Sequence, residues 1–146
     1  MAPASIAYSE SHFHDGESYQ IEILQLPILK CGSCGEVILT NESDEQISDA
    51  IRSAAKLLSP IELRQKREQI GWSTLDLANA TRSAEATIIR WENGGQLHRK
   101  IDDCLLRLIF DRADVRTQLL PTKLIPAISG SSLSLANSTN LTNATK

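Results

Sequence analysis

The sequence predicts a mainly α protein with a small β module at its N-terminus and a disordered C-terminal tail. Helix-start and helix-stop signals are dense between residues 59 and 120, short β-like runs are concentrated before residue 43, and residues 127–146 are mostly Ser, Thr and Asn. We therefore divide the chain into a β-ribbon module (1–43), a connecting helix (44–58), a five-helix domain (59–120) and a tail (121–146).

The β module is expected to be small. Residues 1–17 are polar and show no periodic pattern, so we expect them to be irregular. Apolar residues then alternate at Tyr19, Ile21 and Ile23, and residues 37–39 form a second β-like run after a turn that contains two cysteines. Two short strands around such a turn predict a small β-ribbon.

The helices are indicated by apolar spacing and by end signals. The connecting helix is predicted from apolar residues at helical spacing, namely Ile47, Ile51, Ala54, Ala55 and Leu58. Ser59, Pro60 and Glu62 then form an N-cap, a first-turn proline and a capping box. Gly71 and Ser73 mark the end of that helix and the start of the next. The expected helices are approximately 59–70, 73–80, 84–93, 99–112 and 115–120.

Composition limits the functional class. The net charge of −3 divides unevenly, because residues 1–58 carry three Lys/Arg against nine Asp/Glu, whereas residues 59–112 carry nine against eight. The excess of acidic residues therefore lies outside the helical segment, which leaves that segment free to face a polyanion. No secretory signal and no apolar run long enough to span a bilayer is seen. We expect a protein of the bacterial cytosol or nucleoid that is not an enzyme.

The informative pattern begins at Leu63-Arg64-x2-Arg67 and continues through Ile70-Gly71-Trp72-Ser73-x3-Leu77-Ala78 to Thr87-Ile88-Ile89-Arg90-Trp91-Glu92-Asn93-Gly94. It resembles the Cro-repressor (XRE) helix-turn-helix family. The resemblance implies that Leu77 and Ala78 lie on a scaffold helix and that Ile88 and Trp91 face inward from a recognition helix. It also implies a buried structural ion pair between Arg67 and Glu92, although two solvated charges remain the alternative.

The docking of such a helix in the major groove selects the candidate DNA contacts. By position, Glu85, Ala86 and Arg90 face the bases. The other candidates contact phosphates or bases, namely Thr74, Arg82, Thr87 and Asn93. The turn Thr81-Arg82-Ser83 departs from the family, which usually has glycine at its centre. A left-handed arginine costs about 1 kcal/mol or more, so either the turn is rebuilt or Arg82 is held there to contact phosphate.

The cysteine pair Cys31-Gly-Ser-Cys34-Gly35 follows Leu26-Pro27-Ile28 and is similar to the second half of the zinc ribbon in MqsA-type antitoxins. The first CxxC of that ribbon is absent, and a structural zinc site needs four ligands. His12 and His14 are the candidates for the other two ligands. The alternative is a metal-free, vestigial knuckle. Cys104 is expected in the helical core.

Three functions are considered from these patterns. The first is a sequence-specific regulator of double-stranded DNA, a repressor acting as a homodimer, because one module of this size buries little surface on DNA. The second is an antitoxin whose acidic N-terminal module binds a small basic toxin while the helix-turn-helix represses its own operon. A thiol redox enzyme using Cys31 and Cys34 is disfavoured because the sequence lacks a βαβ frame.

Overall fold

The computed structural model describes residues 1–120 and shows a mixed α/β architecture. A three-stranded antiparallel sheet is followed by six helices in this part of the chain. The strands are β1 (Ala2–His14), β2 (Glu17–Lys30) and β3 (Val37–Leu39). The helices are α1 (Asn41–Ala54), α2 (Pro60–Gln69), α3 (Thr74–Thr81), α4 (Glu85–Glu92), α5 (Lys100–Asp111) and α6 (Ala113–Leu119).

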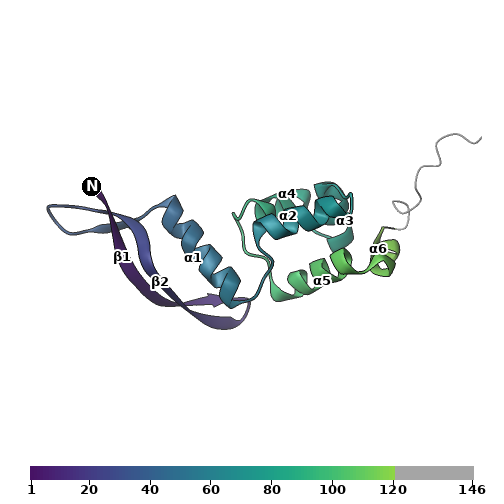
Figure 1. Ribbon diagram of the computed structural model, residues 1–146, viewed down its shortest axis with the longest axis horizontal. Coiled ribbons are helices and arrows are strands. Elements are labelled where there is room, and N and C mark those ends of the chain that lie inside the picture. Colours follow the sequence, from purple (N-terminus) through teal and green to yellow (C-terminus); the bar gives the residue numbers. More distant parts are fainter. Residues whose placement is uncertain (121–146) are drawn as a thin grey trace, which may run out of the picture.

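The molecule is elongated, with the sheet and α1 at one end and α2–α6 at the other (Figure 1). The predicted tail, residues 121–146, lies outside the described residues. No helix within residues 1–120 has the length and apolar character that crossing a bilayer requires.

The long β1–β2 hairpin corrects the expectation that residues 1–17 are irregular. His14 pairs with Glu17 across a two-residue turn, and both turn residues, Asp15 and Gly16, have positive φ angles of 50° and 82°. Asp-Gly is the strongest short-range hairpin signal because this turn needs left-handed backbone at both positions. The signal was in the sequence, but the small and polar residues before it obscured the strand.

A bulge in the hairpin explains why the alternation in β2 blurs after Ile23. Ile6 pairs with Leu26 and Tyr8 pairs with Ile23, so one residue of β1 faces two residues of β2. The extra residue reverses the inward face of β2. Ile21 is therefore buried before the bulge and Leu26 after it, while Leu24 is exposed.

The sheet and α1 form a small core of their own. Ile21 and Leu26 of β2 pack against Ile47 and Ile51 of α1. α1 begins earlier than expected because Thr40 is its N-cap and shares a capping box with the buried Ser43. The Ser43 hydroxyl also donates to the backbone carbonyl of Pro27, which fixes the start of α1 on β2.

The helices α2–α6 enclose a second core, and their predicted ends are largely confirmed. Ser59 and Ser73 each cap a helix with a reciprocal box, to Glu62 and Asp76 respectively. Gly71 has a φ of +72° after α2, as a left-handed stop requires. The fully buried aliphatic residues of this core are Leu63, Leu77, Ile88, Leu106 and Ile109.

The two ends of the molecule are joined where the hairpin turn meets the segment between α4 and α5. The Asp15 carboxylate accepts the backbone N–H of Lys100 at 2.8 Å, and the Lys100 ammonium pairs with Glu17. His14 donates from Nε2 to the backbone carbonyl of His98 at 3.0 Å. Leu97 packs against the core of the sheet and α1.

His98 itself is buried at this junction, with 2% of its surface exposed. Its Nε2 lies 2.9 Å from Oδ1 of Asp103, which also accepts the backbone N–H of Leu58 at 2.7 Å. Burial lowers the pKa of His98, and the positive charge of Arg52 lowers it further, although Asp103 and Asp102 oppose the shift. The imidazole is therefore neutral near pH 7, and its N–H donates to Asp103.

We predict that acid destabilises the protein through His98. Because its pKa is lower in the folded state, the unfolded chain binds this proton more readily. The free energy of unfolding should therefore fall as the pH drops from about 7 to about 5, through the usual histidine range. Urea denaturation at a series of pH values measures this fall. His98→Gln, which keeps a donor for Asp103 but does not titrate, should flatten it, and equal slopes in both proteins would contradict the prediction.

Candidate nucleic-acid interface

One face of α4 is held firmly in the helical core. Ile88 and Trp91 are 0% and 4% exposed, and both belong to the core that includes Leu77 and Ala78 of α3. The small side chain of Ala78 allows α3 and α4 to approach closely. This arrangement is the one that the helix-turn-helix pattern predicted for these four residues.

A buried ion pair ties α4 to α2. Arg67 donates from Nε to Oε1 of Glu92 at 2.5 Å and from Nη2 to Oε2 at 2.9 Å. Its Nη1 donates to the backbone carbonyl of Trp72 at 2.8 Å. The side chains are 11% and 4% exposed, so the structure brings the predicted pair together away from solvent. Two parallel charged hydrogen bonds also fix the rotation of α4 about its axis.

The opposite, leading edge of α4 faces solvent. Glu85, Ala86 and Arg90 are exposed, and Thr87 is half-buried beside them. Thr74, at the start of α3, donates from Oγ1 to Oε1 of Glu85 at 2.6 Å. This hydrogen bond connects the first turns of α3 and α4 and restricts the Glu85 side chain. The five residues therefore share one accessible surface.

Arg82 occupies the turn between α3 and α4 in a left-handed conformation, with φ 56° and ψ 33°. The turn is not rebuilt to avoid this strain. Its backbone N–H bonds to the carbonyl of Asn79 at 3.4 Å, and the next N–H, of Ser83, bonds to Ala78 at 2.9 Å. The Arg82 side chain is exposed next to the start of α4.

At the other end of α4, Asn93 lies beside a cation that the sequence analysis did not select. Arg64 of α2 donates from Nη2 to Oδ1 of Asn93 at 2.9 Å, and its side chain is 49% exposed. It also lies 3.5 Å from the Glu92 carboxylate. Arg64 precedes Arg67 by one helical turn, and this spacing is the signal that could have identified it.

The cysteine pair lies in the turn after β2, at the end of the molecule away from α2–α6 (Figure 1). The turn is closed by hydrogen bonds from Gly35 N–H to the Cys31 carbonyl at 3.0 Å and from Cys31 N–H to the Glu36 carbonyl at 2.8 Å. The hydroxyl of Ser33, 3.1 Å from Cys31 Sγ, and the N–H groups of Cys34 and Ser33 stabilise the thiolate and lower the pKa of Cys31 to about 6.

His12 and His14 do not join this turn, so the proposed four-ligand set is wrong. His12 pairs with Tyr19 near the hairpin turn, whereas Ala2 at the opposite end of β1 pairs with Lys30. At about 3.3 Å per residue, His12 lies roughly 40 Å from the cysteines measured along β2, and His14 lies farther still. His12 instead hydrogen-bonds Tyr8 at 2.7 Å, and His14 bonds the His98 carbonyl.

Two cysteines do not make a closed structural zinc site, which needs four ligands. Within residues 1–120, no group of three or more His, Cys, Asp or Glu side chains could hold a metal ion. Zinc binding by Cys31 and Cys34 stays a prediction. Cys104, expected in the core, is exposed, because the buried stripe of α5 runs through Leu106, Ile109 and Phe110.

Comparison of the chain with models of protein families, with curated proteins and with solved structures finds no match.

We predict that Glu92→Gln destabilises the protein by about 3–5 kcal/mol, because it leaves the Arg67 guanidinium buried beside a neutral amide. Chemical denaturation measures the loss. The matched control is Glu68→Gln, since Glu68 also lies near Arg67, at 3.8 Å, but is 61% exposed. That change should cost less than about 1 kcal/mol. Equal effects of the two substitutions would show that the buried pair does not hold α4.

Proposed function

We propose that α2–α6 form an XRE-type helix-turn-helix domain and that the protein is a sequence-specific regulator of double-stranded DNA, acting as a repressor. The observation that carries this proposal is the two-sided character of α4. Ile88, Trp91 and Glu92 anchor one side, while Glu85 and Arg90 project from the other. A rigid helix with a free leading edge is what insertion into the major groove requires.

The exposed side chains suit base recognition. Arg90 can donate two hydrogen bonds to O6 and N7 of guanine, and Glu85 can accept a hydrogen bond from the amino group of cytosine. The hydrogen bond from Thr74 restrains Glu85 before DNA arrives, which lowers the entropy lost on binding. Ala86 offers a small apolar contact for a thymine methyl group.

The phosphate contacts are assigned to the two ends of α4. Arg82 lies at the turn before α4, and Asn93 lies after it with Arg64 bound to its side chain. An anionic phosphate at Asn93 would therefore also meet a guanidinium. Residues 59–112 carry a net charge of only +1, so binding relies on these local cations more than on an overall basic surface. A homodimer would double the contacts on two half-sites.

We predict that the protein selects a defined sequence from a pool of random DNA duplexes and that Arg90→Ala relaxes the selection at one guanine. Loss of a bidentate contact should weaken binding to the selected duplex by about 1–3 kcal/mol and scarcely change binding to unrelated duplexes. Fluorescence anisotropy with selected and scrambled duplexes measures both quantities.

Two further variants complete this experiment. Arg82→Gly should weaken binding to all duplexes and reduce the salt slope by about one, yet stabilise the free protein by about 1 kcal/mol because it relieves left-handed strain. Lys30→Ala removes an exposed charge from β2 and should leave DNA binding unchanged. Absence of sequence selection, or equal effects of Arg90→Ala and Lys30→Ala, would rule out this role for α4.

A second candidate function is an antitoxin whose sheet module binds a small basic toxin. The specific observation is β3, a short edge strand whose three apolar residues, Val37, Ile38 and Leu39, are each more than 40% exposed. An exposed edge can accept another strand, and the −6 net charge of residues 1–58 favours a basic partner. This function is compatible with the first, since an antitoxin can repress its own operon.

We predict, for this candidate, that the tagged full-length protein co-purifies with a small basic protein encoded beside it. Ile38→Arg places a charge on the exposed edge and should abolish the co-purification, because it opposes both the strand pairing and the attraction of a basic surface. Arg90→Ala, which lies on α4, should retain the partner. If Ile38→Arg retains the partner too, β3 is not the binding edge, and if no such protein is recovered the antitoxin proposal is withdrawn.

A further inference from the structure

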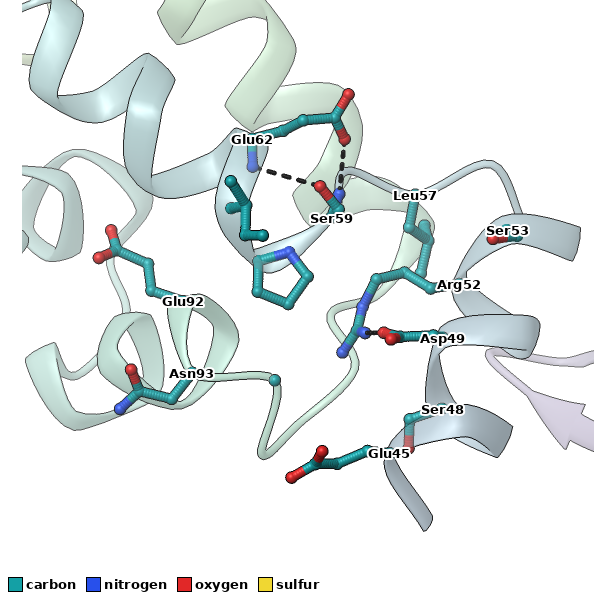
Figure 2. A pocket seen from close by; sticks show the side chains of 13 residues that line it. Glu45, Ser48, Asp49, Arg52, Ser53, Leu57, Ser59, Glu62, Glu92 and Asn93 are labelled. Carbon is teal, nitrogen blue, oxygen red and sulfur yellow. Dashed lines mark hydrogen bonds and ion pairs between the residues drawn. The ribbon is translucent and has the colours of Figure 1, made fainter. Parts of the chain in front are cut away.

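A cavity of about 600 Å³ lies between α1 on one side and the beginning of α2 and the end of α4 on the other (Figure 2). Its volume falls within the range of small-molecule sites. The function proposed above does not use it. Its walls join three segments that are far apart in the sequence.

A buried and incompletely paired guanidinium points into this cavity. Arg52 of α1 is 3% exposed. Its Nη1 donates to Oδ1 of Asp49 at 2.5 Å, but its Nη2 has no hydrogen-bond partner among the described residues. In Figure 2 the guanidinium of Arg52 extends from α1 beside Asp49, on the side of α1 that faces α2 and the end of α4. A buried donor of this kind is costly to leave unpaired, so the site calls for an acceptor oxygen.

The remaining walls are acidic, hydroxylated and apolar. Glu92 is neutralised by Arg67, and the Glu62 carboxylate is engaged by the backbone N–H of Ser59 at 2.9 Å. The hydrogen bond to Ser59 leaves the charge of Glu62 in place, so three carboxylates, those of Glu45, Asp49 and Glu62, and one guanidinium give the walls a net charge of −2. Ser48 and Ser53 add hydroxyl groups, and Leu57, Pro60 and Ile61 add apolar surface.

We propose that this cavity binds a basic amino acid, of which lysine is the simplest representative. Its carboxylate accepts the free N–H groups of Arg52 Nη2 and completes the pairing of the guanidinium. Its ammonium groups lie near Glu45 and Asp49, and its methylene stem packs on Leu57 and Pro60. The net charge of such a ligand is +1, which is opposite in sign to the net negative charge of the walls.

Other simple ligands satisfy only part of this pattern. A phosphate would give Arg52 an acceptor but would be repelled by Glu45 and Asp49. A diamine would suit the carboxylates but would leave Arg52 Nη2 unpaired. The amino acid is the class in which the acceptor and the cations occur on one small molecule.

The position of the cavity gives the ligand a means of regulation. Asn93 and Gly94, at the end of α4, line the same space as α1. A bound molecule would therefore contact both the sheet module and the segment that follows the proposed recognition helix. Any effect on DNA rests on the proposed function, whereas binding of the ligand does not, so the test uses the full-length protein without DNA.

Isothermal titration calorimetry with three related probes tests the chemistry. L-Lysine carries all the groups, cadaverine lacks the carboxylate, and 6-aminohexanoate lacks the α-ammonium group. L-Lysine should bind, and cadaverine should bind about tenfold more weakly or worse, because a charge-assisted hydrogen bond to a buried group is lost. 6-Aminohexanoate should be intermediate. Equal binding of cadaverine and L-lysine, or no heat from L-lysine at millimolar concentration, overturns the proposal.

Substitutions then locate the site. Arg52→Met keeps an unbranched side chain in the same space and should abolish L-lysine binding. Glu45→Gln should weaken binding severalfold, whereas the matched change Glu42→Gln, on an exposed residue of α1 outside the cavity, should not. If Arg52→Met does not fold, the comparison of Glu45→Gln with Glu42→Gln still decides. Equal affinities of those two variants would show that the ligand binds elsewhere.

Discussion

The hydrogen-bonded ion pair between Arg67 and Glu92 is the interaction on which the helical part of the molecule depends. It joins α2 to α4, and the third bond of the guanidinium, to the Trp72 carbonyl, holds the connection between α2 and α3. Apolar packing alone would let α4 rotate by small amounts. A planar fork with fixed partners permits one orientation, and that orientation decides which residues of α4 meet the solvent.

The local rules of helix ends account for what the sequence could predict. Ser59 and Ser73 each combine with an acid three residues later, and such a signal needs no distant partner. The core residues of α3 and α4 were also identified, because Leu77, Ile88 and Trp91 follow a helical period. The expectation of a mainly α protein was only partly correct, because residues 1–17 were expected to be irregular and instead contain β1.

What escaped prediction depends on contacts between distant segments. β1 contains few strong β-formers and exists because β2 pairs along its whole length. His12 and His14 were expected near the cysteines because the sequence does not reveal how β1 pairs with β2. In the observed pairing, these histidines and the cysteines lie at opposite ends of the hairpin. Arg52 was missed for the same reason: it lies among apolar positions of α1, and only the approach of α2 and α4 makes it the wall of a cavity.

The hairpin turn of the sheet also supplies a helix cap across the molecule. Lys100, the first residue of α5, donates its backbone N–H to the carboxylate of Asp15, which lies eighty-five positions earlier in the chain. Leu97 also packs against the sheet and α1. The beginning of α5 is therefore held by contacts with both parts of the molecule, the sheet module and the helical domain. An isolated helical fragment would lose that anion at the positive end of the α5 dipole. A chimera that joins either half to an unrelated sequence would therefore lose this contact, because one half supplies Asp15 and the other supplies Lys100.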